Sequence, residues 1–234
     1  MNLSLIITAA GLSTRFGTGS KKEYLPLTID GKNGTVLSHC LDSFLKTKLF
    51  SNIVITIPKN QQENAKNALK NSSFYNELFT STNFSFAFEE GGKSRQDSVF
   101  CGLKKIEKMA KITPDAVLIH DGARPWITEN IINAVIEKVL LFGAAVTATP
   151  ATDTQKEVDK NGKITKHLRR ENIFAVQTPQ GFLFAPLLEA HKKACNDGNI
   201  YTDDTEIWAK YCGDVYICTG DIANKKITYK EDLK

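Results

Sequence analysis

The 234-residue chain has little of several residue types, and each shortage excludes a class of protein. Its five cysteines are scattered and never spaced as CxxC, so neither a zinc site nor a disulfide framework is indicated, and we expect reduced thiols in a cytoplasmic protein. No apolar run is long enough to span a membrane, and the apolar opening lacks the basic start of a signal peptide. The formal net charge of +4 is too mild, and the basic residues too dispersed, to predict a nucleic-acid partner.

What is present is a repeated alternation of strand and helix patterns. Short apolar segments typical of strands occur at Leu3–Ala9, Ile53–Ile57, Phe84–Phe88, Ala116–His120, Ala144–Thr149 and Val215–Cys218. Between them, apolar residues recur at helical spacing from Val36 to Leu49, from Val99 to Ile106 and from Ile131 to Leu140. This order predicts an α/β fold in one domain over 1–234, a largely parallel twisted sheet with helices on both faces.

Residues 150–178 interrupt this alternation. Two strand-like pieces flank Lys160–Asn161–Gly162, which is a turn signal. We therefore expect a β-hairpin arm that projects from the body of the protein instead of crossing the sheet.

The first strand pattern is followed by a loop of small residues that also contains Arg15, Lys21 and Lys22. Backbone N–H groups in such a loop can approach an anion closely, which predicts a polyphosphate site. The loop has neither the GxxxxGK[ST] nor the GxGxxG pattern, because Ser13 stands in place of the middle glycine. Taken alone, the loop is as consistent with an ordinary strand-to-helix turn that carries surface lysines.

Further polar segments follow other predicted strands, at the sheet edge where open α/β folds bind ligands. In GGKSRQDS (91–98) the glycine pair leaves room for a flat base and Ser98 offers a hydroxyl, although Asp97 is equally suited to a helix N-terminus. The end of the strand before Thr149 lies at the same edge.

HDGARP (120–125) also follows a strand pattern. Asp121 is a natural Mg²⁺ ligand beside phosphates, because Mg²⁺ keeps several waters and needs few protein carboxylates. The alternative is an Asp–Gly turn in which Arg124 pairs with Asp121. We interpret His120 as a structural residue at the strand end and not as a base.

Several motifs in register carry a resemblance to a known family. In order along the chain they are AAGLSTRFG, KKEYLPL, GGKSRQDSV, HDGARP, TDTQKEV, RRENIFAVQTPQGF and YTDDTEI. From Leu3 to about Leu233 the chain closely resembles the cytidylyltransferases of isoprenoid-precursor synthesis. The resemblance implies a Rossmann-like nucleotidyltransferase fold and transfer of CMP from CTP to 2-C-methyl-D-erythritol 4-phosphate, with release of pyrophosphate. It also implies Mg²⁺ or another divalent cation, and a homodimer formed through the β-arm.

The same resemblance assigns roles to individual positions. It implies that Arg15 and Lys22 are catalytic and that Asp121 is the metal ligand. The nucleotide-binding positions that it implies are Ala9, Ala10, Gly11, Gly92, Arg95 and Ser98. The acceptor-binding positions are Arg124, Asp153, Thr154, Lys156, Arg170, Thr202 and Lys226. The chain departs from the family pattern at Glu23, where glutamine is commoner, and at Ala223, where an acidic residue often stands.

The expected chemistry agrees with the shortage of histidine, of which there are four. A phosphate monoester has a second pKa near ~6, so the acceptor is largely dianionic at neutral pH and needs no general base. Ribitol 5-phosphate cytidylyltransferase shares much of this motif set and is the main alternative. A nucleotide-binding module without turnover is a second alternative, against which the presence of Arg15, Lys22 and the acceptor motif argues. A sugar-nucleotide pyrophosphorylase of the same fold, which should prefer UTP, GTP or dTTP, is a weaker third.

Overall fold

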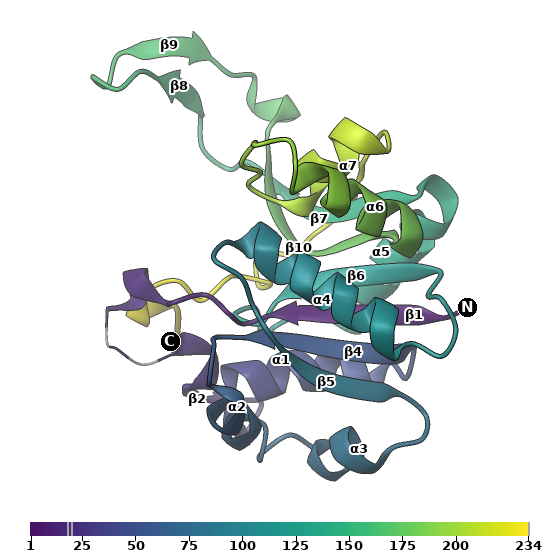
Figure 1. Ribbon diagram of the computed structural model, residues 1–234. Helices are drawn as coiled ribbons and strands as arrows, with labels where there is room; N and C mark the ends of the chain where they lie inside the picture. The colour runs from purple at the N-terminus through teal and green to yellow at the C-terminus, as the bar shows by residue number, and fades with distance from the viewer. Residues whose placement is uncertain (18, 20, 234) are drawn as a thin grey trace.

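The computed structural model describes residues 1–17, 19 and 21–233 (Figure 1). Its centre is a seven-stranded sheet in the order β11-β7-β10-β6-β1-β4-β5. The strands are β1 (Leu3–Thr8), β4 (Phe50–Ile57), β5 (Ser85–Glu90), β6 (Ala116–Asp121), β7 (Ala144–Pro150), β10 (Phe174–Leu183) and β11 (Tyr216–Thr219). Only β10 is antiparallel to its neighbours, β6 and β7. The predicted α/β fold with a largely parallel sheet is confirmed.

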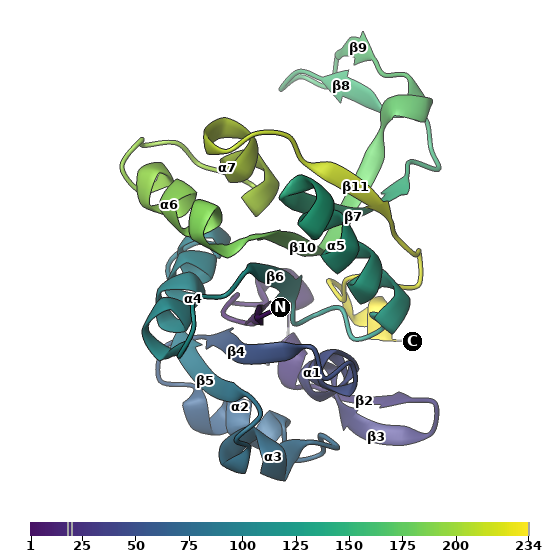
Figure 2. The same cartoon turned by 90° about the vertical axis from the view of Figure 1, so that its right-hand side faces the viewer.

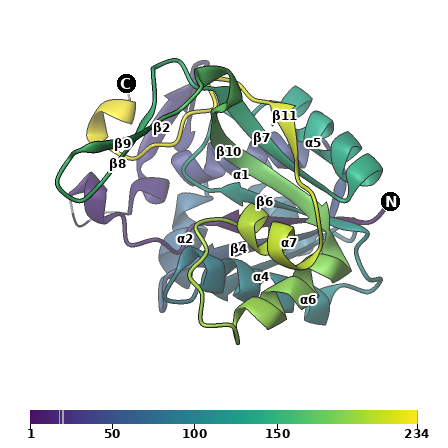
Figure 3. The ribbon, with the colours of Figure 1, turned by 90° about the horizontal axis from the view of Figure 1, so that it is seen from above.

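Helices cover both faces of the sheet (Figures 2 and 3). One face packs against α1 (Val36–Lys46), α2 (Gln62–Ala68), α3 (Tyr75–Thr80) and α5 (Glu129–Phe142). The other packs against α4 (Arg95–Met109), α6 (Phe184–Ala194) and α7 (Asp204–Tyr211). Because side chains alternate along a strand, Leu5 and Ile7 of β1 enter the first core while Ile6 enters the second. Within the described ranges, no helix is both long and apolar enough to cross a membrane.

The helix ends follow local sequence chemistry. Helix α4 begins with a capping box, in which Ser94 accepts from the backbone of Asp97 and Asp97 accepts from the backbone of Ser94. Helix α5 ends at Gly143, whose φ of 87° is the left-handed conformation that glycine tolerates. Helix α1 ends at Lys46, earlier than the apolar pattern predicts, since Lys48 turns to a φ of 57° and Leu49 is 40% exposed.

Two hairpins lie outside the main sheet. The strands β2 (Pro26–Ile29) and β3 (Lys32–Thr35) form the first, and β8 (Lys156–Val158) and β9 (Ile164–His167) form the second, which projects from the body (Figure 1). Both strands of the second are exposed along their length, and Asp159 Oδ1 accepts from two backbone N–H groups of the turn. Short 3-10 helices occupy Thr14–Phe16, Lys22–Tyr24, Arg170–Asn172 and Lys230–Leu233.

The sequence pattern did not indicate the antiparallel strand β10. Its first residues lie inside the stretch assigned to the arm, yet Phe174 already pairs with Pro150 of β7. The projecting part is therefore shorter than 150–178. The expectation of free thiols is confirmed, since all five cysteines are unpaired and Cys40 and Cys218 are buried.

Candidate active site

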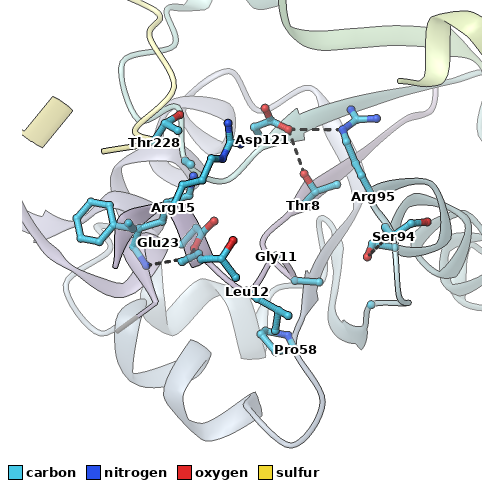
Figure 4. Close-up of a pocket in the computed structure, with 18 of the residues that line it drawn as sticks. Thr8, Gly11, Leu12, Arg15, Glu23, Pro58, Ser94, Arg95, Asp121 and Thr228 are labelled. Carbon is cyan, nitrogen blue, oxygen red and sulfur yellow. Dashed lines mark hydrogen bonds and ion pairs between the residues drawn. The ribbon is translucent and has the colours of Figure 1, made fainter. Parts of the chain in front are cut away.

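A pocket of about 610 Å³ lies beyond the carboxyl ends of β1 and β6 (Figure 4). The loop after β1 forms one wall, the turn between β5 and α4 forms another, and the segment near Lys226 and Thr228 closes a third side. The predicted site residues that line it are Ala10, Gly11, Arg15, Lys22, Gly92, Arg95, Ser98, Asp121 and Lys226. The loop after β1, the 91–98 segment and Asp121 thus meet at the sheet edge where the sequence placed them. The end of β7 at Thr149, expected at the same place, lines a different pocket, and the segment around Lys226 takes its position here.

The two adjacent lysines in the loop after β1, Lys21 and Lys22, have side chains in different places. Lys21 turns back on the loop, where its Nζ lies 2.5 Å from the carbonyl oxygen of Gly11 and 2.9 Å from Glu23 Oε2. Glu23 is 4% exposed, so the carboxylate that departs from the family pattern is buried and neutralised by Lys21. Lys22 instead lines the pocket.

Lys22 is held in place from the far end of the chain. Its Nζ donates to the carbonyl of Ile227 at 2.6 Å, and the residue is 9% exposed. Burial lowers the pKa of Lys22, Glu23 raises it in part, and the nearby ammonium of Lys226 lowers it further. An ammonium carries three donors, so a lysine fixed in this way retains N–H groups for an anionic ligand.

The carboxylate of Asp121 is surrounded by three cationic side chains. Lys226 Nζ lies 2.8 Å from its carboxylate, Arg124 Nε 3.6 Å and Arg95 Nε 3.8 Å. Burial would raise the pKa of Asp121, but the attraction of Lys226, Arg95 and Arg124 outweighs it and holds the pKa well below its ordinary value. Three cations around one carboxylate leave a net positive charge, which suits a polyanionic ligand.

His120 is buried behind Asp121 and has both ring nitrogens in use. His120 Nε2 lies 3.1 Å from the Arg124 carbonyl, which can only accept, so Nε2 carries the proton. In the neutral ring Nδ1 is then an acceptor, and the Thr178 hydroxyl donates to it at 3.0 Å while accepting from the backbone N–H of Asp121, also at 3.0 Å. Burial lowers the pKa of His120 to about 4, so the ring is neutral at pH 7 and structural, as interpreted from the sequence.

We expect this histidine to make stability depend on pH. The folded state resists protonation until pH falls to about 4, whereas the unfolded chain binds the proton near ~6.5. The free energy of unfolding therefore decreases as pH falls from about 6.5 to 4, by about 3 kcal/mol for this one group. Thermal unfolding across that range should show the loss in the wild type and a smaller one in His120→Asn, which should also retain most of its activity. Equal pH dependence in both proteins would contradict the expectation.

Of the glycine pair after β5, Gly91 packs against the first loop and Gly92 packs against the first turn of α4. A Cβ on Gly91 would lie 2.3 Å from Ala10 Cβ and 2.7 Å from Ser98 Oγ, and one on Gly92 would lie 2.2 Å from Asp97 Cβ. The two loops can approach each other only because Gly91 has no side chain, and Gly92 lets the chain turn closely into α4. A Cβ on Gly11, by contrast, would have no neighbour within 4 Å.

These glycines offer a matched pair of substitutions. Gly91→Ala should lower the free energy of unfolding by about 1–3 kcal/mol, since Ala10 or Ser98 must move. Gly11→Ala should leave the melting temperature near that of the wild type but weaken nucleotide binding, because its methyl group enters the pocket. Thermal unfolding and nucleotide titration check both. A Gly91→Ala protein as stable as the wild type would show that the loops do not pack as described.

Other predicted site residues lie outside the pocket lining. Ala9 is buried beneath the loop, and Arg124 lies behind Asp121, where its Nη1 donates to the Asn224 carbonyl at 2.7 Å. Thr202 is exposed and donates to Glu206. The predicted residues near the arm, also exposed, are Asp153, Thr154, Lys156 and Arg170. A single chain therefore does not bring these arm residues into the pocket.

Sequence reasoning missed Asp204. The YTDDTEI motif pointed to Thr202, but Asp203 caps α7 and Asp204, the next residue, is completely buried. Asp204 Oδ2 lies 2.6 Å from Arg95 Nη1, and Asp204 Oδ1 lies 3.1 Å from His191 Nε2. The available signal was the pair of adjacent aspartates. One carboxylate is enough to cap the helix, so the second indicated a separate role.

The three-layer α/β fold and a cationic, glycine-lined pocket at the carboxyl ends of parallel strands are the arrangement expected of a nucleotidyltransferase. The model of one such family, described as 2-C-methyl-D-erythritol 4-phosphate cytidylyltransferase, matches residues 3–234. The chain belongs to this family.

Individual relatives match over most of their length. A 2-C-methyl-D-erythritol 4-phosphate cytidylyltransferase of Clostridium novyi is 36% identical over 229 residues, covering 97% of this chain and 92% of the relative. One of Bacillus licheniformis is 35% identical over 235 residues, covering 100% and 93%. Among solved structures, a 4-diphosphocytidyl-2C-methyl-D-erythritol synthase of Anaerococcus prevotii superposes with a TM-score of 0.78 at 26% identity, covering 99% and 94%. A cytidylyltransferase of Francisella tularensis gives 0.77 at 27%, covering 100% and 97%.

Proposed function

We propose that this chain transfers CMP from CTP to 2-C-methyl-D-erythritol 4-phosphate, forming 4-diphosphocytidyl-2-C-methyl-D-erythritol and releasing pyrophosphate. The observation that carries the proposal is the pocket in which Lys22 and Lys226, from opposite ends of the chain, meet Asp121 beside the small-residue loop. The names of the full-length relatives support the same activity.

In the reaction, an oxygen of the acceptor phosphate attacks the α-phosphorus of CTP. A new P–O bond forms as the bond to the β-phosphate breaks, and pyrophosphate leaves with the bonding pair. The acceptor dianion needs no proton removed, which agrees with a pocket beside a neutral, fully bonded His120. The protein's task is to hold two polyanions together and to stabilise charge on the α-phosphate and the leaving group. Arg15, Lys22 and Lys226 are among the cations that line the pocket, and we assign that task to them.

A divalent cation such as Mg²⁺ fits the donor set that is present. Among the described residues no group of three or more His, Cys, Asp or Glu side chains could hold a metal, and Asp121 is the one carboxylate at the strand end beside Lys226. A single carboxylate is what Mg²⁺ requires when phosphate oxygens and waters supply its other ligands. When bound, the ion would neutralise charge on the triphosphate.

The cytosine and ribose would lie against the glycine-lined wall. Ala10, Gly91, Gly92 and Ser98 line this side of the pocket, and Gly91 lies close against Ala10. Backbone donors and acceptors distinguish the amino group of cytosine from the carbonyl of uracil, because the wrong base leaves a buried polar group unpaired.

The acceptor site is completed, in this proposal, by the arm of a second subunit. The residues near the arm that the resemblance assigns to the acceptor are exposed in the single chain. A two-stranded hairpin is marginally stable alone, so a partner surface would also stabilise it. We therefore propose a homodimer formed through the β8–β9 arm.

The five free cysteine thiols of each chain are compatible with a location in the reducing cytoplasm.

Pyrophosphate release by the purified protein with CTP and Mg²⁺ tests the function. We expect turnover with 2-C-methyl-D-erythritol 4-phosphate and much less with ribitol 5-phosphate, UTP or GTP. Faster turnover with ribitol 5-phosphate would reassign the acceptor. CTP binding without turnover on either acceptor would indicate a nucleotide-binding module.

A further inference from the structure

The guanidinium of Arg95 extends between two carboxylates. Its Nε lies 3.8 Å from Asp121 Oδ1 (Figure 4). Its Nη1 lies 2.6 Å from Asp204 Oδ2. The shorter of the two contacts is thus made with Asp204, which does not line the pocket. Arg95 is the first residue of α4, where the helix enters the pocket wall.

Asp204 and His191 form a buried pair behind Arg95. Both side chains are 0% exposed, and His191 Nε2 must donate to the Asp204 carboxylate because a carboxylate only accepts. The His191 ring stacks on Phe100 of α4, so the pair joins α6, α7 and α4. The proposed reaction assigns a role to neither residue.

The orientation of Arg95 has a consequence for Asp121. The strong geometry for an arginine and a carboxylate is a fork of two parallel hydrogen bonds. Arg95 does not make that fork with Asp121: its Nε lies 3.8 Å away, beyond hydrogen-bond distance, and its Nη2 is buried without a hydrogen-bond partner among the described residues, while Nη1 donates to Asp204. The short contact of Asp121, at 2.8 Å, is made with Lys226 instead.

We propose that Asp204, supported by His191, is a positioning residue that holds Arg95 away from Asp121. Without the Asp204 charge, the guanidinium turns and forms the fork with Asp121, which is the other carboxylate that it contacts. Asp121 is then neutralised by arginine, and Lys226 loses its partner at the reacting phosphate. The inference rests on the proposed function for the identity of the reaction.

Asp204→Asn tests this with separate readouts for binding and chemistry. We expect the dissociation constant for CTP, measured by calorimetry without acceptor, to stay within about threefold of the wild type because the pocket remains cationic. We expect kcat to fall by about tenfold or more, as for other coupled charge networks. The double variant Asp204→Asn/Arg95→Gln should be no slower than Arg95→Gln alone, because Asp204 acts through Arg95. A kcat near the wild-type value, or losses that multiply in the double variant, would overturn the proposal.

His191 supplies a second, independent test if Asp204→Asn does not fold. His191→Gln keeps an N–H donor for Asp204 and should retain kcat within about threefold, whereas His191→Met removes the donor at similar volume and should lose several-fold more. Ile207→Val, also in α7, controls for lower stability and should keep its kcat. Equal rates for His191→Gln and His191→Met would contradict the proposal. A wild-type protein that binds CTP but transfers nothing would refute the proposed function instead.

Discussion

Lys22→Ala should lower kcat for cytidylyl transfer by about a hundredfold or more while weakening CTP binding far less. The Lys22 ammonium is fixed by the Ile227 carbonyl at 2.6 Å and already lies in the pocket before any ligand arrives. A donor that is pre-organised in this way acts most strongly on charge that develops in the transition state. Arg15→Ala should show the same pattern. Steady-state kinetics, with CTP binding measured separately, provide the test.

The adjacent lysine is the matched control. Lys21 has the same charge but bonds to Gly11 and Glu23, so Lys21→Ala should keep kcat within about tenfold of the wild type. A Lys22→Ala enzyme with kcat within a few-fold of the wild type would refute the assignment of Lys22. Equal, large losses in Lys21→Ala and Lys22→Ala would point to the folding of the loop and not to catalysis.

Mixing two inactive variants should restore activity if Arg170 acts across a dimer. Arg170 is exposed and donates only to the Thr152 carbonyl at 3.2 Å among the described residues, so nothing in its own chain directs it to the pocket. Arg170→Ala and Lys22→Ala homodimers should each be nearly inactive. If the arm serves the partner's site, a heterodimer has one intact site and one that lacks both groups. Complete random exchange then restores about a quarter of wild-type activity, since half of the dimers are mixed and each has one working site.

The alternative arrangement gives a different result in the same experiment. If Arg170 serves its own site, every site in the heterodimer lacks one group and no activity returns. Subunit exchange must be verified, for example with differently tagged chains. A monomeric protein in solution would contradict the proposed dimer itself.

Local sequence patterns predicted strands and helix ends well where interactions between neighbouring residues determine them. The alternation of apolar segments predicted six of the seven sheet strands, and Gly143 and the Ser94–Asp97 pair end or begin helices as such residues do elsewhere. Strand β10 was not predicted. Its segment Phe174–Leu183 is exposed at one end and buried at the other, so no single period describes it.

The sequence by itself determined the order of strands and helices, the small-residue loop with its lysines, and the family motifs. The tertiary structure alone decided which charges meet: Arg95, Asp121, Asp204 and Lys226 come from four different elements or loops and form one network. It also decided that Lys22 faces the pocket while Lys21 bonds to its own loop. The physical reason is that apolar periodicity reports which face of an element is buried. The partner of a buried charge depends on how distant elements pack, and sequence spacing does not encode that distance.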